Sequence, residues 1–202
     1  KSTLLNTVSG NFLPEAGNII LEGQDITTWP TEIRARLISR VFQDTKMGTA
    51  SRLTIEENIA LASKRGEDRG LTRGVKHNDR LAMKERLATL QLGLEDRLTT
   101  DVAFLSGGQR QALTLLMATM VYPRLLLLDE HTAALDPKVS DMVLYITRRI
   151  VEEQHITTLM ITHNMEDALR LGNRLIMLHQ GQVILDVAGE EKAQLTVPSL
   201  LE

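Results

Sequence analysis

A five-residue string, Leu-Ser-Gly-Gly-Gln at 105–109, has the composition of a phosphate-binding turn. Its two glycines lack side chains, so an anion can approach the backbone closely. Ser106 and Gln109 have the Ser-x-x-Gln spacing of a capping box, which predicts that a helix starts here. The free N–H groups and the positive dipole end of that helix would form an anion site. The simpler interpretation is a capped helix that follows a glycine turn.

Two acids, Asp129 and Glu130, directly follow the apolar run Leu125–Leu128. Such a run is typical of a parallel strand that is buried on both faces. Ligands of open α/β sheets bind at the carboxyl ends of the strands, where one acid could hold Mg²⁺ and the second could orient an attacking water. Solvated acids at a strand end are the alternative, but a charge beside four leucines is costly without a partner.

The first three residues, Lys1, Ser2 and Thr3, match the end of the phosphate-binding loop G-x-x-x-x-G-K-[ST]. In that loop the lysine reaches the β- and γ-phosphates, and the next hydroxyl binds Mg²⁺. Three residues gain weight as a motif only from the segments that follow at the right distance. We expect the glycines of the loop, and a strand before them, to precede Lys1.

Gln43 and His163 each follow a short segment with the pattern of a strand. We expect both side chains to lie at the same sheet edge as Asp129. Gln43 could offer an amide oxygen to Mg²⁺ and an amide N–H to water, and His163 could donate to a γ-phosphate. A structural polar role is the alternative for either residue.

The chemistry needs a parallel sheet to hold these residues together. Strands alternate with helices in the last half of the chain, which predicts such a sheet with crossover connections. Asp136 and Pro137 have the pattern of an N-cap and a first helical residue, and Asn164 can cap the next helix. The expected strands are Ser39–Gln43, Leu125–Leu128 and Thr157–Thr162.

Two further patterns complete the predicted architecture. The segment Gly17–Ile26 reads as a strand pair or as a strand and a turn, with Gly23 and Gln24 near the turn. The segment Arg174–Leu185 reads as a hairpin around Gln180-Gly181. The sequence between Leu53 and Leu98 has helical periodicity, interrupted by the polar connection 65–78. We therefore expect an inserted α-helical subdomain at about 44–113, within a core formed by 1–43 and 114–202.

Composition excludes several functions. The chain has 202 residues, a net charge of -3 and no cysteine. The absence of cysteine excludes disulfides, thiolate zinc sites and cysteine nucleophiles, and it suits a cytoplasmic protein. The charge provides no overall basic field for nucleic acid. No apolar run approaches the ~20 residues that span a bilayer.

In their order and spacing these motifs resemble those of the ATP-binding-cassette (ABC) ATPase family over essentially the whole chain. In family terms they are the end of Walker A, the Q-loop, the signature motif, Walker B, the D-loop and the H-loop. They correspond to Lys1–Thr3, Gln43, Leu105–Gln109, Leu125–Glu130, Ala134–Asp136 and Thr162–His163. The resemblance implies a P-loop NTPase-type parallel sheet with flanking helices, a small antiparallel β part and an inserted α-helical subdomain. It also implies that the strand before Lys1 lies beside Leu125–Leu128.

The resemblance assigns ATP and Mg²⁺ as ligands. Lys1 and Thr3 would bind phosphates, while Ser2, Gln43 and Asp129 would hold Mg²⁺. Glu130 would polarise the attacking water, assisted by Gln43 and His163, and His163 would contact the γ-phosphate. A second subunit would bind head to tail, with Asp136 at the dimer interface. The residues that would close over the ATP of that second subunit are Ser106, Gly107, Gly108 and Gln109.

The chain departs from the common family pattern at two positions of its D-E-H-T-A-A-L-D-P string. His131 follows Glu130 where proline is usual, and Ala134 replaces a frequent serine. The string is similar to that of one group of bacterial importer ATPases suspected of serving amino-acid-like solutes.

The resemblance implies an ATPase subunit that powers a membrane transporter, with import favoured over export. Its partners would be transmembrane permease subunits, contacted through Asp44–Thr54, and a solute-binding protein, with no nucleic acid. The subunit would be peripheral at the cytoplasmic face of the cell membrane. The alternative is an ABC-type machine for DNA repair or translation, but those carry coiled-coil insertions, zinc modules or a second cassette, and this sequence shows none of them.

Overall fold

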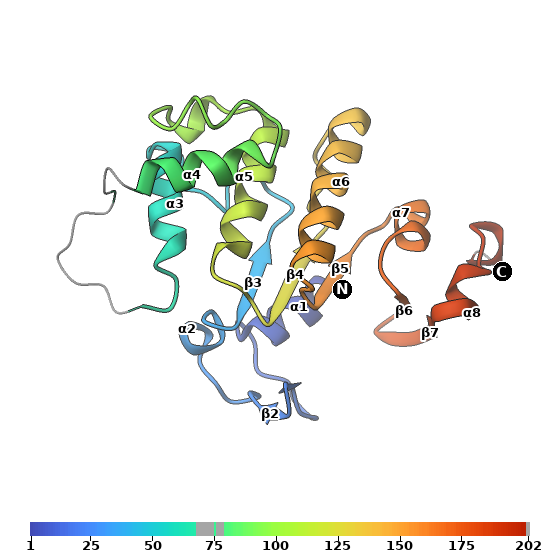
Figure 1. Ribbon diagram of the computed structural model, residues 1–202. Coiled ribbons are helices and arrows are strands. Elements are labelled where there is room, and N and C mark those ends of the chain that lie inside the picture. Colours follow the sequence, from blue (N-terminus) through green and yellow to red (C-terminus); the bar gives the residue numbers. More distant parts are fainter. Residues whose placement is uncertain (68–74, 76–78, 201–202) are drawn as a thin grey trace.

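Three parallel strands form the centre of the computed structural model, which describes residues 1–67, 75 and 79–200 (Figure 1). The strands are β3 (Ile38–Val41), β4 (Leu125–Asp129) and β5 (Thr158–Ile161), in the order β3–β4–β5. Both pairings are parallel, so the carboxyl ends of the strands meet at one edge. The predicted α/β class and the three predicted strands are confirmed.

One face of this sheet is covered by α5 (Gly107–Met120) and α6 (Pro137–Glu153). Leu126 and Leu128 of β4 pack into the same hydrophobic cluster as residues of both helices. The helices bury this face because successive side chains of a strand point to opposite sides, so every second residue of β4 meets them.

The other face of the sheet is covered by α1 (Ser2–Ser9). Here Leu127 of β4 shares a cluster with Ile38 of β3 and Leu5 of α1, all of them buried. The apolar run of β4 is therefore buried on both faces, as the sequence predicts. Asp129 lies two residues after Leu127, so its side chain is directed to the α1 face.

One expectation about the sheet is wrong. The family pattern implied a strand from before Lys1 beside Leu125–Leu128, but β4 pairs with β3 on one side and with β5 on the other. Strand order is set by contacts between distant segments, which local patterns do not determine. The sequence of β5 has the apolar pattern of a buried strand, but most of its side chains are only half-buried.

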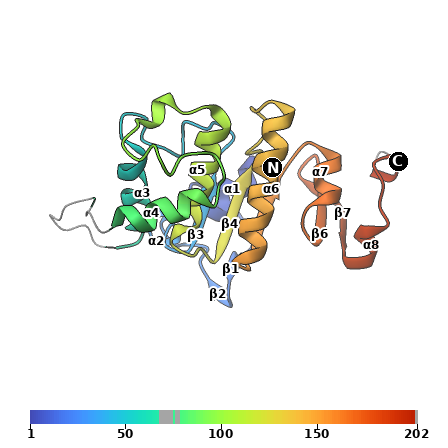
Figure 2. The same ribbon diagram turned by 45° about the horizontal axis from the view of Figure 1, so that its top comes forward.

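The helical block contains α3 (Ile55–Ser63) and α4 (Asp79–Ala88) beside α5, at the opposite end of the molecule from β6 and β7 (Figures 1 and 2). Thr54 starts α3 with a capping box that includes Glu57. Of the connection expected at 65–78, residues 68–74 and 76–78 lie outside the described residues. The subdomain boundary expected at residue 113 falls inside α5 and stays a prediction.

The two antiparallel pairs are confirmed. β1 (Ile20–Leu21) pairs with β2 (Gln24–Asp25), and β6 (Arg174–His179) pairs with β7 (Gln182–Ala188). In the second turn Gln180 has a φ of 47° and Gly181 a φ of 82°, the conformation in which a two-residue turn matches the twist of its strands.

The remaining elements are short. Asn164 caps α7 as predicted, because its side chain accepts hydrogen bonds from the N–H groups of Glu166 and Asp167. Pro30 is followed by only a short helix. None of the helices in the described part of the chain is long and apolar enough to cross a membrane. The short elements are α2 (Thr31–Arg34), α7 (Met165–Arg170), α8 (Gly189–Ala193) and the 3₁₀ turns Val102–Phe104 and Pro198–Leu200.

A buried arginine fixes the far end of α1. Arg34 donates hydrogen bonds to the carbonyl oxygens of Thr7 (2.8 Å) and Val8 (2.9 Å). The same guanidinium reaches the carbonyls of Thr27 (2.6 Å) and Trp29 (3.0 Å). Arginine satisfies the last carbonyls of a helix well because it is a cation with several donors. α1 is thereby held at one end by Arg34, and its other end carries Ser2.

Candidate functional site

The carboxyl ends of the central strands bring the predicted site residues to one edge of the sheet. Gln43 follows β3, Asp129 ends β4 with Glu130 next to it, and His163 follows β5. The N–H of Glu130 donates to the carbonyl oxygen of Ile161 (3.0 Å), which continues the pairing of β4 with β5 past Asp129. The predicted placement at one edge is confirmed.

Asp129 is buried, and both oxygens of its carboxylate have partners. Ser2 Oγ donates to Oδ1 at 3.3 Å, and Arg40 Nη2 donates to Oδ2 at 2.6 Å. The structure thus joins Ser2 and Asp129, which lie 127 positions apart. It also adds Arg40, which the sequence analysis did not single out.

The strand register places Arg40 beside Asp129. Arg40 pairs with Leu127 in the parallel ladder, so it points to the same face as Leu127 and Asp129. A cation on the neighbouring strand and on the same face is the natural partner of a buried acid.

Glu130 and His163 meet at the same edge. His163 Nδ1 lies 3.1 Å from Glu130 Oε2. The backbone of Glu130 has a φ of 45°, a left-handed conformation that costs energy for a residue with a side chain. Such strain gathers at functional sites and persists where the surroundings fix it. The turn directs the Glu130 carboxylate to His163.

His131, next along the chain, is buried against α6. Its Nε2 lies 3.0 Å from Thr147 Oγ1, and that hydroxyl donates its own hydrogen to the Val143 carbonyl (2.8 Å). Thr147 must therefore accept, so His131 carries its proton on Nε2. Burial lowers the pKa of His131 to about 4, so the ring is neutral at physiological pH. This contact fastens the end of β4 to α6 just after the strained Glu130.

The signature string starts α5 as predicted. Gln109 N–H donates to Ser106 Oγ (3.2 Å), and Ser106 N–H donates to Gln109 Oε1 (3.2 Å), which completes the capping box. The helix begins at Gly107, so its free N–H groups lie within this string. Ser106 and Gly107 are exposed.

Gly108 has a packing reason that the sequence analysis did not foresee. It is buried, and an added Cβ would lie 2.3 Å from Val139 Cγ1 of α6. Only glycine allows α5 and α6 to approach this closely. The start of α5 thereby packs against α6, whose N-cap residue Asp136 is exposed.

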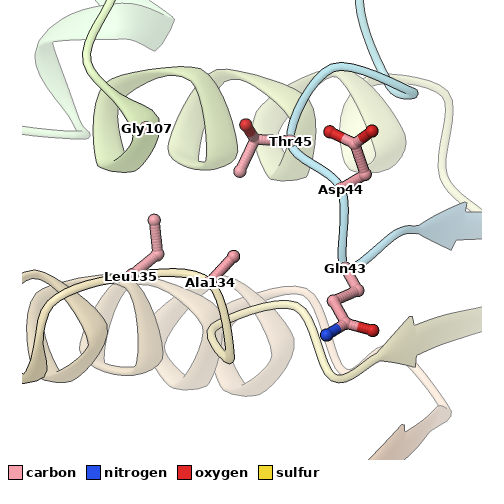
Figure 3. Close-up of a pocket in the computed structure, with 6 residues that line it drawn as sticks. All are labelled: Gln43, Asp44, Thr45, Gly107, Ala134 and Leu135. Carbon is pink, nitrogen blue, oxygen red and sulfur yellow. The ribbon is translucent and has the colours of Figure 1, made fainter.

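An open cleft of about 350 Å³ separates the signature string from the sheet edge. In Figure 3, Thr45 and Gly107 lie on one side of it, and Ala134 and Leu135 on the other. Gln43 is exposed and lines this cleft, and within the described residues it has no hydrogen bond to Ser2 or Asp129. The structure therefore places Gln43 at the edge without joining it to those two residues.

A second contact that the sequence did not predict links α5 to the segment that contains Gln43. Gln111, fully buried, donates from Nε2 to the Phe42 carbonyl oxygen (3.1 Å). Phe42 directly precedes Gln43, so the helix that begins at the signature string is bonded to the residue before the predicted Q-loop.

Lys1, Ser2 and Thr3 are exposed at the first turn of α1, where N–H groups have no partner within the helix. A helix N-terminus favours anions such as phosphate. Because Ser2 bonds to Asp129, this anion-binding end lies beside the carboxyl end of β4.

The residues at this edge fit a magnesium ion. The Ser2 hydroxyl and the Asp129 carboxylate place two hard oxygen donors together, which is the donor type Mg²⁺ prefers. The described part of the chain contains no cluster of three or more His, Cys, Asp or Glu side chains that could hold a metal. Mg²⁺ is commonly held by one or two carboxylates with substrate phosphates and waters, so a single carboxylate suffices.

The parallel sheet, the anion-binding start of α1 and the acidic end of β4 define the class of P-loop nucleoside triphosphatases. Residues 1–133 match the protein family described as ABC transporter. The tyrosine transport ATP-binding protein of Clostridioides difficile is 46% identical over 202 residues, which are 100% of this chain and 80% of that protein. The thiamine import ATP-binding protein of Photorhabdus laumondii is 34% identical over 98% of this chain and 79% of its own length.

Solved structures agree with these relatives. A dimeric ATP-binding cassette in a post-hydrolysis state, bound to ADP and phosphate, superposes with a TM-score of 0.73 at 28% identity. The match covers 93% of this chain and 79% of that one. The chain belongs to the ABC transporter family, and it is an ATPase subunit of that family.

The contact between His131 and Thr147 generates a stability prediction. Thr147→Val keeps the shape of the side chain but leaves the buried His131 N–H without an acceptor. We expect a loss of about 1–3 kcal/mol in the free energy of unfolding, measured by chemical denaturation. Thr119→Val is the control, because among the described residues the buried Thr119 hydroxyl bonds only to carbonyls of its own helix. Equal losses in the two variants would contradict the role of Thr147 as the acceptor.

Proposed function

We propose that this ABC ATPase powers the import of an amino-acid-like solute by hydrolysing MgATP between two head-to-tail copies. The observation that carries the proposal is the pairing of Ser2 with Asp129 beside the pairing of Glu130 with His163, at one sheet edge. The relative that transports tyrosine supports the solute class, because its identity extends over the whole chain.

The phosphates bind at the start of α1. Lys1 supplies a positive charge, and Thr3 and the free N–H groups of the helix supply hydrogen-bond donors. Ser2 and Asp129 would hold Mg²⁺, and Gln43, which follows β3 at the same sheet edge, would supply a further oxygen ligand. When bound, Mg²⁺ neutralises charge that develops on the phosphate oxygens.

Glu130 is the base for the attacking water. Its carboxylate is only partly exposed and projects from a fixed turn, so it can accept a proton from a water held near the phosphate. His163 steadies that carboxylate through Nδ1, and its exposed ring is free to contact the γ-phosphate.

Each nucleotide is closed by the second copy. Ser106 and Gly107 lie at the exposed start of α5, and Asp136 lies at the exposed start of α6. We assign the signature residues Ser106–Gln109 to the ATP of the second copy, with Asp136 at the interface. The solved dimeric cassette, at 28% identity, supports this arrangement.

The permease docks on the segment that follows Gln43. Met47, in the segment Asp44–Thr54, is 64% exposed, and Phe104, before the signature string, is 74% exposed. The two segments adjoin, because the Ala103 N–H donates to the Ser51 carbonyl oxygen (3.1 Å). Exposed apolar side chains on adjoining segments are candidates for a protein interface. Bound to the permease, the subunit sits at the cytoplasmic face of the membrane, and it works with a solute-binding protein.

The relatives that import solutes leave the alternative functions, DNA repair and translation, without support.

Removing the base tests the chemistry. Glu130→Gln in the intact subunit should bind ATP but hydrolyse it about 10²–10⁴-fold more slowly, because general-base assistance is lost. The variant should accumulate as an ATP-bound dimer, detected by size-exclusion chromatography. Glu166→Gln, an exposed acid near the same edge, is the control and should hydrolyse at the normal rate. Steady-state hydrolysis by Glu130→Gln within about threefold of the unmodified subunit would remove Glu130 from this role.

Ser106→Arg tests the shared site. It should abolish hydrolysis while the monomer binds nucleotide almost normally, because Ser106 serves the ATP of the other copy. The substitution also removes the cap of α5, so its loss of stability is compared with that of Thr54→Arg, which removes the same type of cap from α3. A mixed dimer of Ser106→Arg and Lys1→Ala subunits places both changes at one site and should keep the other site active. Lost nucleotide affinity in the Ser106→Arg monomer alone would show that the string acts within its own chain.

The solute class is tested in vesicles that contain the complete transporter. ATP hydrolysis should rise when an amino acid such as tyrosine is supplied with the solute-binding protein. Thiamine and sulfate are the controls, because other relatives import them. Stimulation by thiamine or sulfate, with none by amino acids, would contradict the assignment.

A further inference from the structure

We propose that Arg40 is a positioning residue that holds Asp129 in the orientation that faces Ser2. This proposal rests on the proposed function, because it takes Ser2 and Asp129 as the protein's ligands to Mg²⁺. It adds a residue that lies outside the six motifs.

Arg40 is fixed from three directions. Its Nη2 donates to Asp129 Oδ2 at 2.6 Å, and its Nη1 donates to Asn6 Oδ1 at 2.5 Å. The guanidinium carbon lies 4.8 Å from the centre of the Phe42 ring, within the range of a cation–π contact. The side chain is only 11% exposed. A cation held this firmly can define the position of the groups that it bonds.

The two oxygens of Asp129 have separate partners. Arg40 occupies Oδ2, and the Ser2 hydroxyl occupies Oδ1. Because a carboxylate is planar, fixing one oxygen limits the rotation of the other. Arg40 therefore orients the oxygen that Ser2 contacts without taking its place.

Through its bond to Asn6, Arg40 also fixes the position of α1. Asn6 lies four residues after Ser2, so both side chains are on one face of the helix. The bond from Arg40 to Asn6 ties this face to β3, while the bond to Asp129 ties β3 to β4. One guanidinium thus sets the position of the helix that carries Ser2 and of the strand end that carries Asp129.

Three roles for Arg40 predict different effects of its removal on Mg²⁺. A nearby cation that acted only through its charge would repel Mg²⁺, so its loss would strengthen the contribution of Mg²⁺ to nucleotide binding. A purely structural arginine would weaken binding equally with and without the metal. A positioning residue makes the contribution of the metal fall, because the ligands lose their geometry.

Arg40→Met separates these roles. The affinity for β,γ-imido-ATP is measured by titration calorimetry with Mg²⁺ and with excess EDTA, and the ratio of the two affinities is the gain from the metal. We expect this gain to fall by about 10-fold or more, as is usual when an outer-shell partner of a metal ligand is removed. An unchanged or larger gain would overturn the proposal.

Matched variants complete the test. Arg65→Met removes another arginine that is only partly exposed, which bonds to Ser39 and to the carbonyls of Ala118 and Val121, and it should leave the gain from Mg²⁺ unchanged. Arg40→Lys keeps the charge but cannot bridge two partners in the same way, so its gain should be intermediate. Should Arg40→Met fail to fold, Arg40→Lys decides the matter, and a gain equal to that of the unmodified protein would overturn the proposal.

Asp129→Asn distinguishes failure of this proposal from failure of the proposed function. If Asp129→Asn loses the gain from Mg²⁺ and Arg40→Met keeps it, the magnesium site stands and the role of Arg40 is wrong. If Asp129→Asn also keeps the gain, Asp129 is not a metal ligand and both proposals fall.

Discussion

A carboxylate at the buried end of an apolar strand must be satisfied, and the site is arranged around that requirement. Asp129 follows four leucines that are packed between helices, so its charge would be costly without partners. Ser2 and Arg40 supply one partner for each oxygen. The same two contacts bring the start of α1 against the end of β4. The groups that satisfy the buried charge of Asp129 therefore also place the phosphate-binding end of α1 beside the metal-binding carboxylate.

The sheet divides the machinery between its two faces. Arg40, Asn6 and Asp129 lie on the α1 face, while the signature string and the start of α6 belong to the helices of the other face. Hydrogen bonds at the ends of the strands connect the helices to the segments that carry the site residues. Gln111 of α5 bonds to Phe42, the residue before Gln43. His131, the residue after Glu130, bonds to Thr147 of α6. A movement of α5 and α6 toward a second copy would therefore act on the segments that carry Gln43 and Glu130.

Local patterns predicted much of this structure because their causes are local. The capping box at Ser106, the cap at Asn164 and the turn at Gln180 depend on residues a few positions apart, and all three are confirmed. The shared edge of Asp129, Glu130 and His163 followed from parallel strands. Strand order depends on contacts between distant segments, so the neighbour expected for β4 was wrong. Arg40 and His131 were missed as contacts because their partners are distant, and the packing role of Gly108 needed the position of α6.

The central claim is that the carboxyl edge, with Asp129 held between Ser2 and Arg40, is where the metal and the phosphates bind. A crystal structure of the intact Glu130→Gln subunit with ATP and Mn²⁺ tests it most directly, because anomalous scattering locates the metal. The account predicts Mn²⁺ beside Ser2 and Asp129, with Arg40 still bonded to Asp129 and Ser106 of the second copy at the γ-phosphate. A metal elsewhere, or an Asp129 carboxylate turned away from Ser2, would contradict it.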